Sequence, residues 1–108
     1  PVAADTRPVI VLQGPHCVSS NEAFVQMMAA LPTVTTMGAN TRGASANPAP
    51  FDLYPNVQVT VPRWQTLTLD STLLEGRGSD PEVGAEFPAE VFRTADPLLD
   101  AALERLAR

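Results

Sequence analysis

The sequence predicts an α/β domain built around a small parallel sheet. Residues 9–12 form a short, apolar, β-branched run bounded by Pro8 and a Gly-Pro pair, as is typical of a buried strand. A second β-branched run, residues 33–37, ends at Gly38. Between them, residues 20–31 predict a helix, because apolar side chains recur there at helical spacing, at Phe24, Met27, Met28 and Leu31. This strand–helix–strand order predicts a parallel pair with a right-handed crossover.

Composition narrows the classes of partner and cofactor. The chain has 108 residues, enough for one domain, and a net charge of −5, which argues against a nucleic-acid or anionic-membrane partner. No apolar run is long enough to span a membrane. One histidine and one cysteine cannot build a closed metal site, and we expect no cofactor. All seven basic residues are arginine, so a lysine base would have to come from another chain.

The second half predicts strands, loops and one helix. Residues 39–50 and 75–82 are rich in small residues and predict loops, the first of them either a close approach to a ligand or a plain connector. Residues 57–61 alternate as a half-buried strand does, and residues 64–69 are the expected partner strand. The final helix is predicted to begin at Asp96 and Pro97 and to bury a stripe of Leu99, Ala102, Leu103 and Leu106.

Ser19 lies where the first strand delivers the chain to the first helix. Free amides and the positive end of the helix dipole favour negative charge at such a point, so Ser19 is a candidate nucleophile beside an oxyanion site. The pattern Ser19-x-x-Glu22 also predicts a capping box, in which both side chains bond helix amides. His16 is a candidate base and Cys17 a candidate nucleophile, although a turn histidine is commonly a surface residue and such a cysteine a core residue.

Four motifs in order resemble the catalytic domain of the tail-specific, or C-terminal processing, serine peptidases, a family that includes the tricorn core protease and the retinoid-binding interphotoreceptor repeats. The resemblance covers residues 8–106. Its motifs are the serine-rich turn 18–22, the Gly-x-x-Thr-x-Gly loop 38–43, the Glu-Gly-x-Gly segment 75–82 and the Asp-Pro-x-Leu-x-x-Ala-Leu helix 96–103.

The resemblance implies a mixed-sheet, crotonase-like α/β fold with flanking helices, of which residues 1–108 are the C-terminal part. The resemblance implies that the N-terminal half of the catalytic domain and any PDZ module lie outside these residues. Ser19 matches the nucleophile, the Ser20 amide an oxyanion donor and Glu75 an assisting glutamate. Ala44 stands where one branch of the family has its catalytic lysine, so the chain is similar to the lysine-free branch, whose base is an upstream histidine.

The resemblance therefore implies a serine endopeptidase that hydrolyses unstructured polypeptide through Ser19, with Glu75 assisting, and that is inactive as an isolated fragment. The alternative is a non-catalytic ligand- or peptide-binding domain of the same fold, like the retinoid-binding relatives. The implied partners are a polypeptide substrate, the missing N-terminal half and a second copy through an exposed sheet edge. A periplasmic or secreted location follows only by analogy with relatives.

Overall fold

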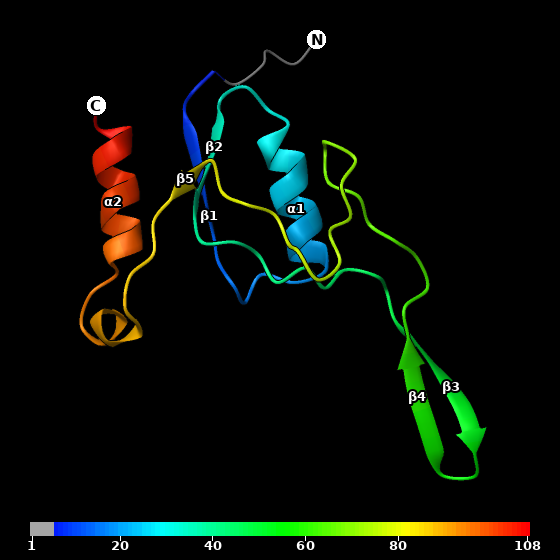
Figure 1. The fold of residues 1–108 in the computed structure, drawn as a ribbon. Helices are drawn as coiled ribbons and strands as arrows, with labels where there is room; N and C mark the ends of the chain where they lie inside the picture. The colour runs from blue at the N-terminus through cyan, green and yellow to red at the C-terminus, as the bar shows by residue number, and fades with distance from the viewer. Residues whose placement is uncertain (1–5) are drawn as a thin grey trace.

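A computed structural model describes residues 6–108 of the chain, and its main body is a mixed α/β unit (Figure 1). Strand β1 (Val9–Gln13) and strand β2 (Val34–Gly38) are parallel, and helix α1 (Ser20–Ala29) connects them. The short strand β5 (Val83–Gly84) pairs with β2 in parallel, which makes the sheet order β1-β2-β5. The predicted α/β class and the parallel pair are confirmed.

The core of the body is small and consists of aliphatic residues from three elements. Val11 of β1, Val25 of α1 and Val34 of β2 pack together, and Cys17 and Met28 pack against this cluster. The helix predicted over residues 20–31 is present but ends at Ala29. Of its apolar residues at helical spacing Met28 packs on the core, whereas Phe24 and Met27 are 50% and 65% exposed. The helix instead turns Val25 and a fully buried carboxylate, that of Glu22, toward the sheet and the loops.

A β-hairpin projects away from this body (Figure 1). Strand β3 (Ala49–Tyr54) pairs antiparallel with β4 (Val57–Val61) across a turn in which Asn56 has φ 66°. The expected pairing of residues 57–61 with residues 64–69 is therefore wrong. The two-residue connection suits a hairpin with the preceding segment. Residues 64–69 form no strand and take part only in an isolated bridge between Leu67 and Leu73.

The projecting hairpin makes the molecule less compact than an ordinary domain of this size. The radius of gyration is 17.3 Å, whereas a compact domain has about 13 Å at ~100 residues. The hairpin's apolar side chains remain open to solvent, among them Phe51, Leu53, Val57 and Val61. A two-stranded hairpin is marginally stable on its own, and this one keeps an exposed apolar surface.

The chain ends in a short 3₁₀ helix, η1 (Ala89–Arg93), and in helix α2 (Pro97–Leu106), which lies against β1. As predicted, Asp96 caps α2 by accepting a hydrogen bond from the Leu99 amide at 3.0 Å, and Pro97 occupies the first turn. The predicted stripe is only partly right. Ala102 is buried, but Leu99, Leu103 and Leu106 are more than two-fifths exposed. Within residues 6–108, neither α1 nor α2 is long and apolar enough to cross a membrane.

Candidate active site

Ser19 has the most unusual backbone of the candidate residues. Its φ of 54° and ψ of −121° lie in a region that side-chain-bearing residues rarely adopt. It stands after the β1 turn and immediately before α1, and it is solvent-exposed. The geometry is that of a sharp strand–turn–helix elbow, which in hydrolases presents a serine hydroxyl away from the sheet.

The carboxylate of Glu22 holds this elbow together. Glu22 is fully buried, and each of its oxygens accepts two hydrogen bonds. Oε2 accepts from the amides of Ser19 at 3.1 Å and Ala44 at 2.9 Å. Oε1 accepts from the Thr41 hydroxyl at 2.8 Å and the Gly43 amide at 2.6 Å. A buried charge is tolerated only when it is well bonded, so this carboxylate ties the start of α1 to the loop after β2.

The predicted capping box is present, and its better-formed hydrogen bond is the one that the Glu22 carboxylate accepts. The Ser19 amide bonds the carboxylate, whereas the Ser19 hydroxyl makes no well-formed capping bond of its own. The Glu22 amide bonds the Ser19 carbonyl oxygen at 2.9 Å. Ser20 begins α1, and among residues 6–108 no acceptor bonds its amide. Ser19 therefore carries an available hydroxyl next to an available amide.

Two glycine-containing loops close against each other behind the elbow. Thr41 is buried; it donates to Glu22 and accepts from the Ser79 amide at 2.8 Å. The Gly76 amide donates to the Gly43 carbonyl oxygen at 2.8 Å. A Cβ at Gly43 would lie 2.5 Å from the Gly78 nitrogen, and φ there is +72°. The close approach of the loop at Gly43 is thus to another backbone segment of this chain, whereas the expected approach of residues 39–50 to a ligand stays a prediction.

Glu75 contacts Ser45, the residue that follows a backbone partner of Ser19. Its Oε1 accepts from the Ser45 amide at 2.7 Å, while the neighbouring Ala44 carbonyl accepts from the Ser19 amide at 3.0 Å. The Trp64 indole donates to the Ser45 carbonyl oxygen at 3.2 Å, although the ring is 55% exposed. The fold therefore brings Ser19, Ser20 and Glu75 to one region, with no hydrogen bond between the side chains of Ser19 and Glu75 within residues 6–108.

The other candidate residues lie on the turn before Ser19. His16 is exposed and makes no hydrogen bond to Ser19 within the described part of the chain. Cys17 packs against the core; burial, and then the negative charge of Glu22, raise the pKa of its thiol above the ordinary value of 9.0. A raised pKa suppresses the thiolate, so Cys17 is a poor nucleophile. No group of three or more potential ligands in residues 6–108 could hold a metal ion.

Sequence reasoning missed the structural importance of Gln13 and Thr41. Gln13 is 5% exposed, and its Nε2 donates to the carbonyl oxygens of Ser79 at 2.8 Å and Ala39 at 3.2 Å. Thr41 bridges Glu22 and Ser79, as described above. The available signal was a polar residue at each point, a glutamine ending an apolar strand and a threonine between two glycines. Their partners are distant in sequence, so only the fold shows what they do.

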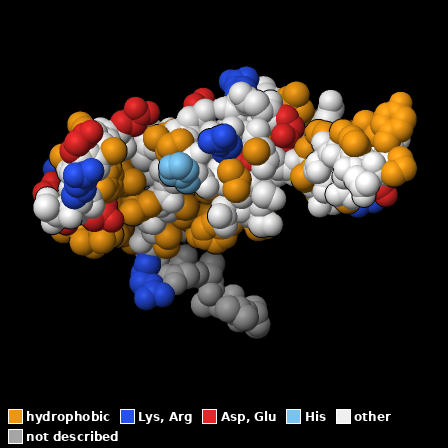
Figure 2. Space-filling model, turned by 90° about the horizontal axis from the view of Figure 1, so that it is seen from below, with side chains coloured by type: hydrophobic (Ala, Val, Ile, Leu, Met, Phe, Trp, Pro, Cys, Tyr) orange, Lys and Arg blue, Asp and Glu red, His pale blue; other side chains and the backbone are white. Residues whose placement is uncertain are grey.

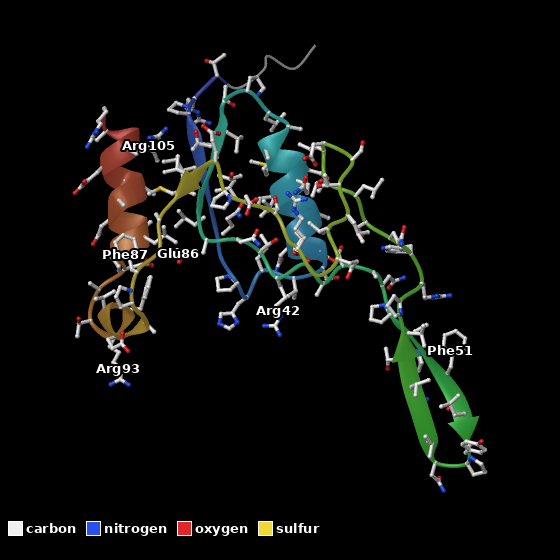
Figure 3. The ribbon with its side chains drawn as sticks, viewed as in Figure 1. Arg42, Phe51, Glu86, Phe87, Arg93 and Arg105 are labelled. Carbon is white, nitrogen blue, oxygen red and sulfur yellow. The ribbon has the colours of Figure 1, made fainter. Side chains whose placement is uncertain are left out.

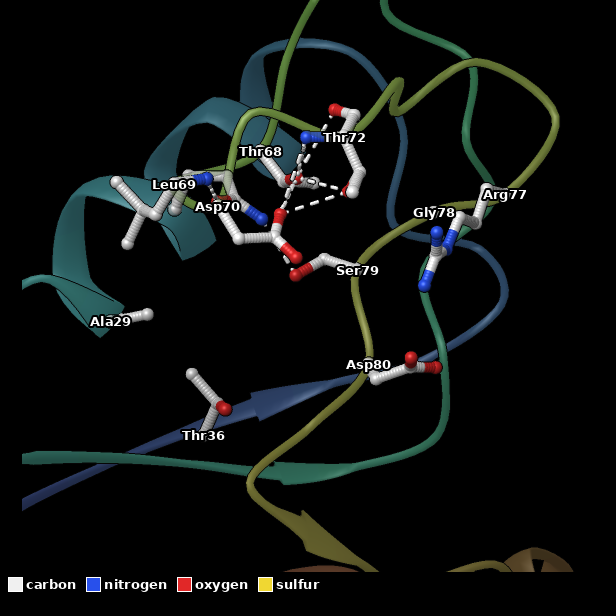
Figure 4. A pocket seen from close by; sticks show the side chains of 11 residues that line it. Ala29, Thr36, Thr68, Leu69, Asp70, Thr72, Arg77, Gly78, Ser79 and Asp80 are labelled. Atoms are coloured by element: carbon white, nitrogen blue, oxygen red, sulfur yellow. Dashed lines mark hydrogen bonds between the residues drawn. The ribbon is translucent and has the colours of Figure 1, made fainter.

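A polar cavity of about 260 Å³ lies on the far side of the glycine loops, between α1 and the Thr68–Thr72 turn (Figure 4). Asp70 lines it and accepts hydrogen bonds from the Thr68 hydroxyl and from the Thr72 hydroxyl at 2.9 Å. These bonds hold the pKa of Asp70 below its ordinary value of 3.8. The network closes the Thr68–Thr72 turn, and the carboxylate is therefore engaged within the loop.

Comparison with solved structures finds the same fold in peptidases. A candidate peptidase from Parabacteroides merdae matches 94% of this chain with a TM-score of 0.82 and 34% sequence identity. The tricorn protease also matches 94% of the chain, with a TM-score of 0.73 and 23% identity, which shows a common fold alone. The fold is peptidase-like.

The matched region is a small part of each of these proteins. This chain covers 32% of the Parabacteroides protein and 11% of the tricorn protease. No protein-family model matches the chain, and no curated protein matches it at a significant level. The comparisons therefore show that this chain has a peptidase-like fold, without assigning it to a family.

Proposed function

We propose that this chain is the C-terminal part of a crotonase-like serine endopeptidase domain of the tail-specific type, with Ser19 as its nucleophile. The observation that carries the proposal is the Ser19 elbow, with its φ of 54° and ψ of −121° at the start of α1. Backbone strain persists only where surrounding structure enforces it, and it gathers at functional sites. Here the buried Glu22 carboxylate and the Ala44 carbonyl oxygen both bond the Ser19 amide and enforce it.

In this mechanism the Ser19 hydroxyl oxygen attacks the carbonyl carbon of the scissile peptide bond, and its proton passes to a general base. The new oxyanion accepts a hydrogen bond from the Ser20 amide, which has no acceptor within residues 6–108. Collapse of the tetrahedral intermediate breaks the C–N bond and the leaving amine takes the proton. Water then hydrolyses the acyl-serine by the reverse sequence.

Glu75 has an assisting role in this proposal. Its carboxylate bonds the Ser45 amide at 2.7 Å, and this holds the segment whose Ala44 carbonyl contacts Ser19. The second carboxylate oxygen can orient a base that comes from outside residues 6–108. Because this chain covers 32% of the Parabacteroides protein, we propose that the rest of the catalytic domain supplies the base. The 108-residue chain alone is then expected to show no turnover.

The same reasoning names the partners. The remaining part of the catalytic domain would pack on the sheet edges and the open apolar side chains, and unstructured polypeptide would be the substrate. A second copy of the chain could pair through an exposed edge, since β3, β4 and β1 each have one unpaired edge among the described strands. Association of this kind is a proposal, and sedimentation of the chain at several concentrations would measure it.

A fluorophosphonate probe tests the nucleophile. The native protein in its source cells is treated with the probe, and the peptide that contains Ser19 is sought by mass spectrometry. We expect an adduct on Ser19 that Ser19→Ala abolishes. Ser20→Ala is the matched control, because it keeps the backbone amide and should retain labelling. An unlabelled but folded protein would refute the enzyme and favour the non-catalytic binding domain.

A further inference from the structure

The β3–β4 hairpin is an arm with two open edges. Its strands pair only with each other, so β3 and β4 each have one unpaired edge among the described strands (Figure 1). The arm is anchored where it leaves the body. There the carbonyl oxygen of the buried Ala46 accepts hydrogen bonds from the amides of Arg63 at 2.9 Å and Trp64 at 3.4 Å. The hairpin therefore has a held start, and its edges are available to a partner.

One face of the hairpin is apolar and the other is polar. Residues that lie opposite each other in an antiparallel pair share a face of the sheet. By the register of the pairing, the apolar face carries Ala49, Phe51, Tyr54, Val57, Val59 and Val61. Phe51 and Tyr54 are 54% and 74% exposed. Figure 2 shows apolar side chains gathered at the end of the molecule that the hairpin forms, and Figure 3 shows Phe51 on this hairpin, apart from the helices.

The edge of β3 is blunted, whereas the edge of β4 is not. Pro50 has no amide hydrogen, and a proline within a sheet stands where the missing hydrogen faces the open edge. Leu53 is an extra residue in the register of β3, which makes a bulge there, and Asp52 adds a charge. Prolines, bulges and charges are the features by which proteins keep an edge strand from pairing. The β4 sequence, Val-Gln-Val-Thr-Val, has none of them, so β4 is the edge left open to another strand.

The strand β4 matches a second copy of itself. Antiparallel pairing about Val59 sets Val57 opposite the partner's Val61, and Gln58 opposite the partner's Thr60. Each valine then meets a valine on the apolar face, a favourable cross-strand pair, and the amide meets a hydroxyl on the polar face. A shift of one residue would set valines against side chains of the other face. A two-fold axis at Val59 therefore makes a closed, self-complementary contact.

The distribution of charge also favours this meeting point. Each copy has a net charge of −5, so two copies repel each other. The strand β4 carries no charge, and Asp52 is the one charged residue in the hairpin sequence. Like charges directly opposite each other would destabilise a strand paired with its own copy, and β4 avoids this. Joining two hairpins also turns a marginal two-stranded sheet into a four-stranded one.

We propose that β4 pairs with β4 of a second copy in an antiparallel, two-fold arrangement, which gives a sheet of strand order β3-β4-β4-β3. This deepens the proposed function, which names a second copy and an exposed edge, by assigning the edge, the register and the symmetry. It uses no catalytic step. A contact made by one five-residue strand is small, so the dimer belongs to the weak class of interfaces that bury less than ~1,200 Å².

Cysteine cross-linking tests the register. Val59→Cys places a thiol opposite its own copy, with Cβ atoms about 4.5–5.5 Å apart, so a small backbone shift allows a disulfide on mild oxidation. Gln58→Cys is the matched control, because its two thiols lie diagonally, about 7–8 Å apart, and should cross-link at least about tenfold less. A mixture of Gln58→Cys and Thr60→Cys proteins should form the mixed dimer. All these variants retain Cys17, so any cross-link through Cys17 cancels in the comparison.

Sedimentation of the 108-residue chain at several concentrations measures the equilibrium. Val59→Lys sets two like charges opposite each other and should raise the dissociation constant of the dimer at least about tenfold. Ala107→Lys adds the same charge at an exposed site on the far side of the body and should change that constant less than about twofold. Added salt should strengthen the dimer, because it screens the repulsion between two chains of charge −5.

Each result decides for or against the inference. Circular dichroism checks that every variant is folded, and the exposed positions Gln58 and Thr60 test the register if Val59→Cys unfolds the hairpin. Equal cross-linking of Val59→Cys and Gln58→Cys overturns the register. A monomer at all concentrations, or unchanged association of Val59→Lys, overturns the role of β4.

The same cross-linking in the native protein, in its source cells, distinguishes a second copy from another cover. A missing Val59→Cys dimer there would mean that a different segment occupies β4, which overturns the inference. The fluorophosphonate experiment is independent of these results. A labelled Ser19 in a protein that stays monomeric leaves the proposed nucleophile standing and rejects the dimer, whereas an unlabelled dimer supports the inference and rejects the enzyme.

Discussion

Replacing Glu22 by glutamine should destabilise the protein strongly although it changes almost no volume. The carboxylate accepts four hydrogen bonds, and a glutamine has one oxygen to offer. The least unfavourable arrangement turns the new NH₂ group toward Thr41, whose hydroxyl can rotate to accept. The Gly43 amide then faces another donor and loses its acceptor.

The structure sets the size of the effect. One lost bond to a charged group is worth about 1.5–3 kcal/mol, and the two bonds that remain, from Ser19 and Ala44, each lose about 1 kcal/mol when their acceptor becomes neutral. The expected loss in the free energy of unfolding is therefore about 3.5–5 kcal/mol, out of the ~5–15 kcal/mol of an ordinary domain. Urea unfolding followed by circular dichroism measures it.

Glu82→Gln is the matched control, because the Glu82 side chain is exposed, and surface changes stay within about 0.5 kcal/mol. If Glu22→Gln unfolds at the same urea concentration as Glu82→Gln, the buried carboxylate does not hold the elbow. The explanation for the Ser19 conformation would then be wrong. A loss of fluorophosphonate labelling in a folded Glu22→Gln protein would instead support the link between this carboxylate and the elbow.

Further predictions concern other positions near the site. Gly43→Ala should lower the free energy of unfolding by about 2–5 kcal/mol, because the new Cβ would meet backbone atoms. Gly76→Ala is the control: Gly76 has φ +73° but open space around it, so the loss should be only about 1–2 kcal/mol. Equal losses in thermal melts would contradict this reasoning. Iodoacetamide should alkylate Cys17 at pH 8 more slowly in the folded protein than in urea, because the raised thiol pKa suppresses the thiolate. Since the folded state holds the thiol proton more tightly than the unfolded state, the thiol's contribution to folding stability is fully present below pH ~9 and declines as the pH rises above it. NMR titration should show the pKa of Asp70 rising toward its usual value of 3.8 in Thr68→Val, and an unchanged pKa would reject the hydrogen bond as the cause of the shift. In the unmodified protein the lowered pKa stabilises the fold above pH 3.8, and this stabilisation is lost as the pH falls through the folded pKa.

Local signals in the sequence were sufficient for the body of the fold. The β-branched runs predicted at residues 9–12 and 33–37 are the parallel strands Val9–Gln13 and Val34–Gly38, and the serine-rich turn begins the helix between them. Asp96 and Pro97 started α2 as predicted. These features depend on steric preferences and hydrogen bonds within a few residues, which a sequence displays directly.

Burial was less predictable, and Phe24 shows why. Its spacing with Met27 and Leu31 correctly predicted a helix, yet all three side chains are about half exposed or more. Hydrophobic periodicity identifies the face of a helix that can pack but does not say what packs there. Val25 packs against Val11 and Val34 of the sheet, whereas Phe24 lines a cavity of about 550 Å³.

By itself, the sequence determined the α/β class, the strand–turn–helix position of Ser19 and the capping partner Glu22. Only the tertiary structure decided that Glu22 binds the Thr41–Ala44 segment and that this segment closes on residues 74–79. The physical reason is that capping joins residues a few positions apart, whereas the bonds of Thr41 join residues separated by 19 and 38 positions. Such pairs exist only once the sheet and the loops have fixed the path of the backbone.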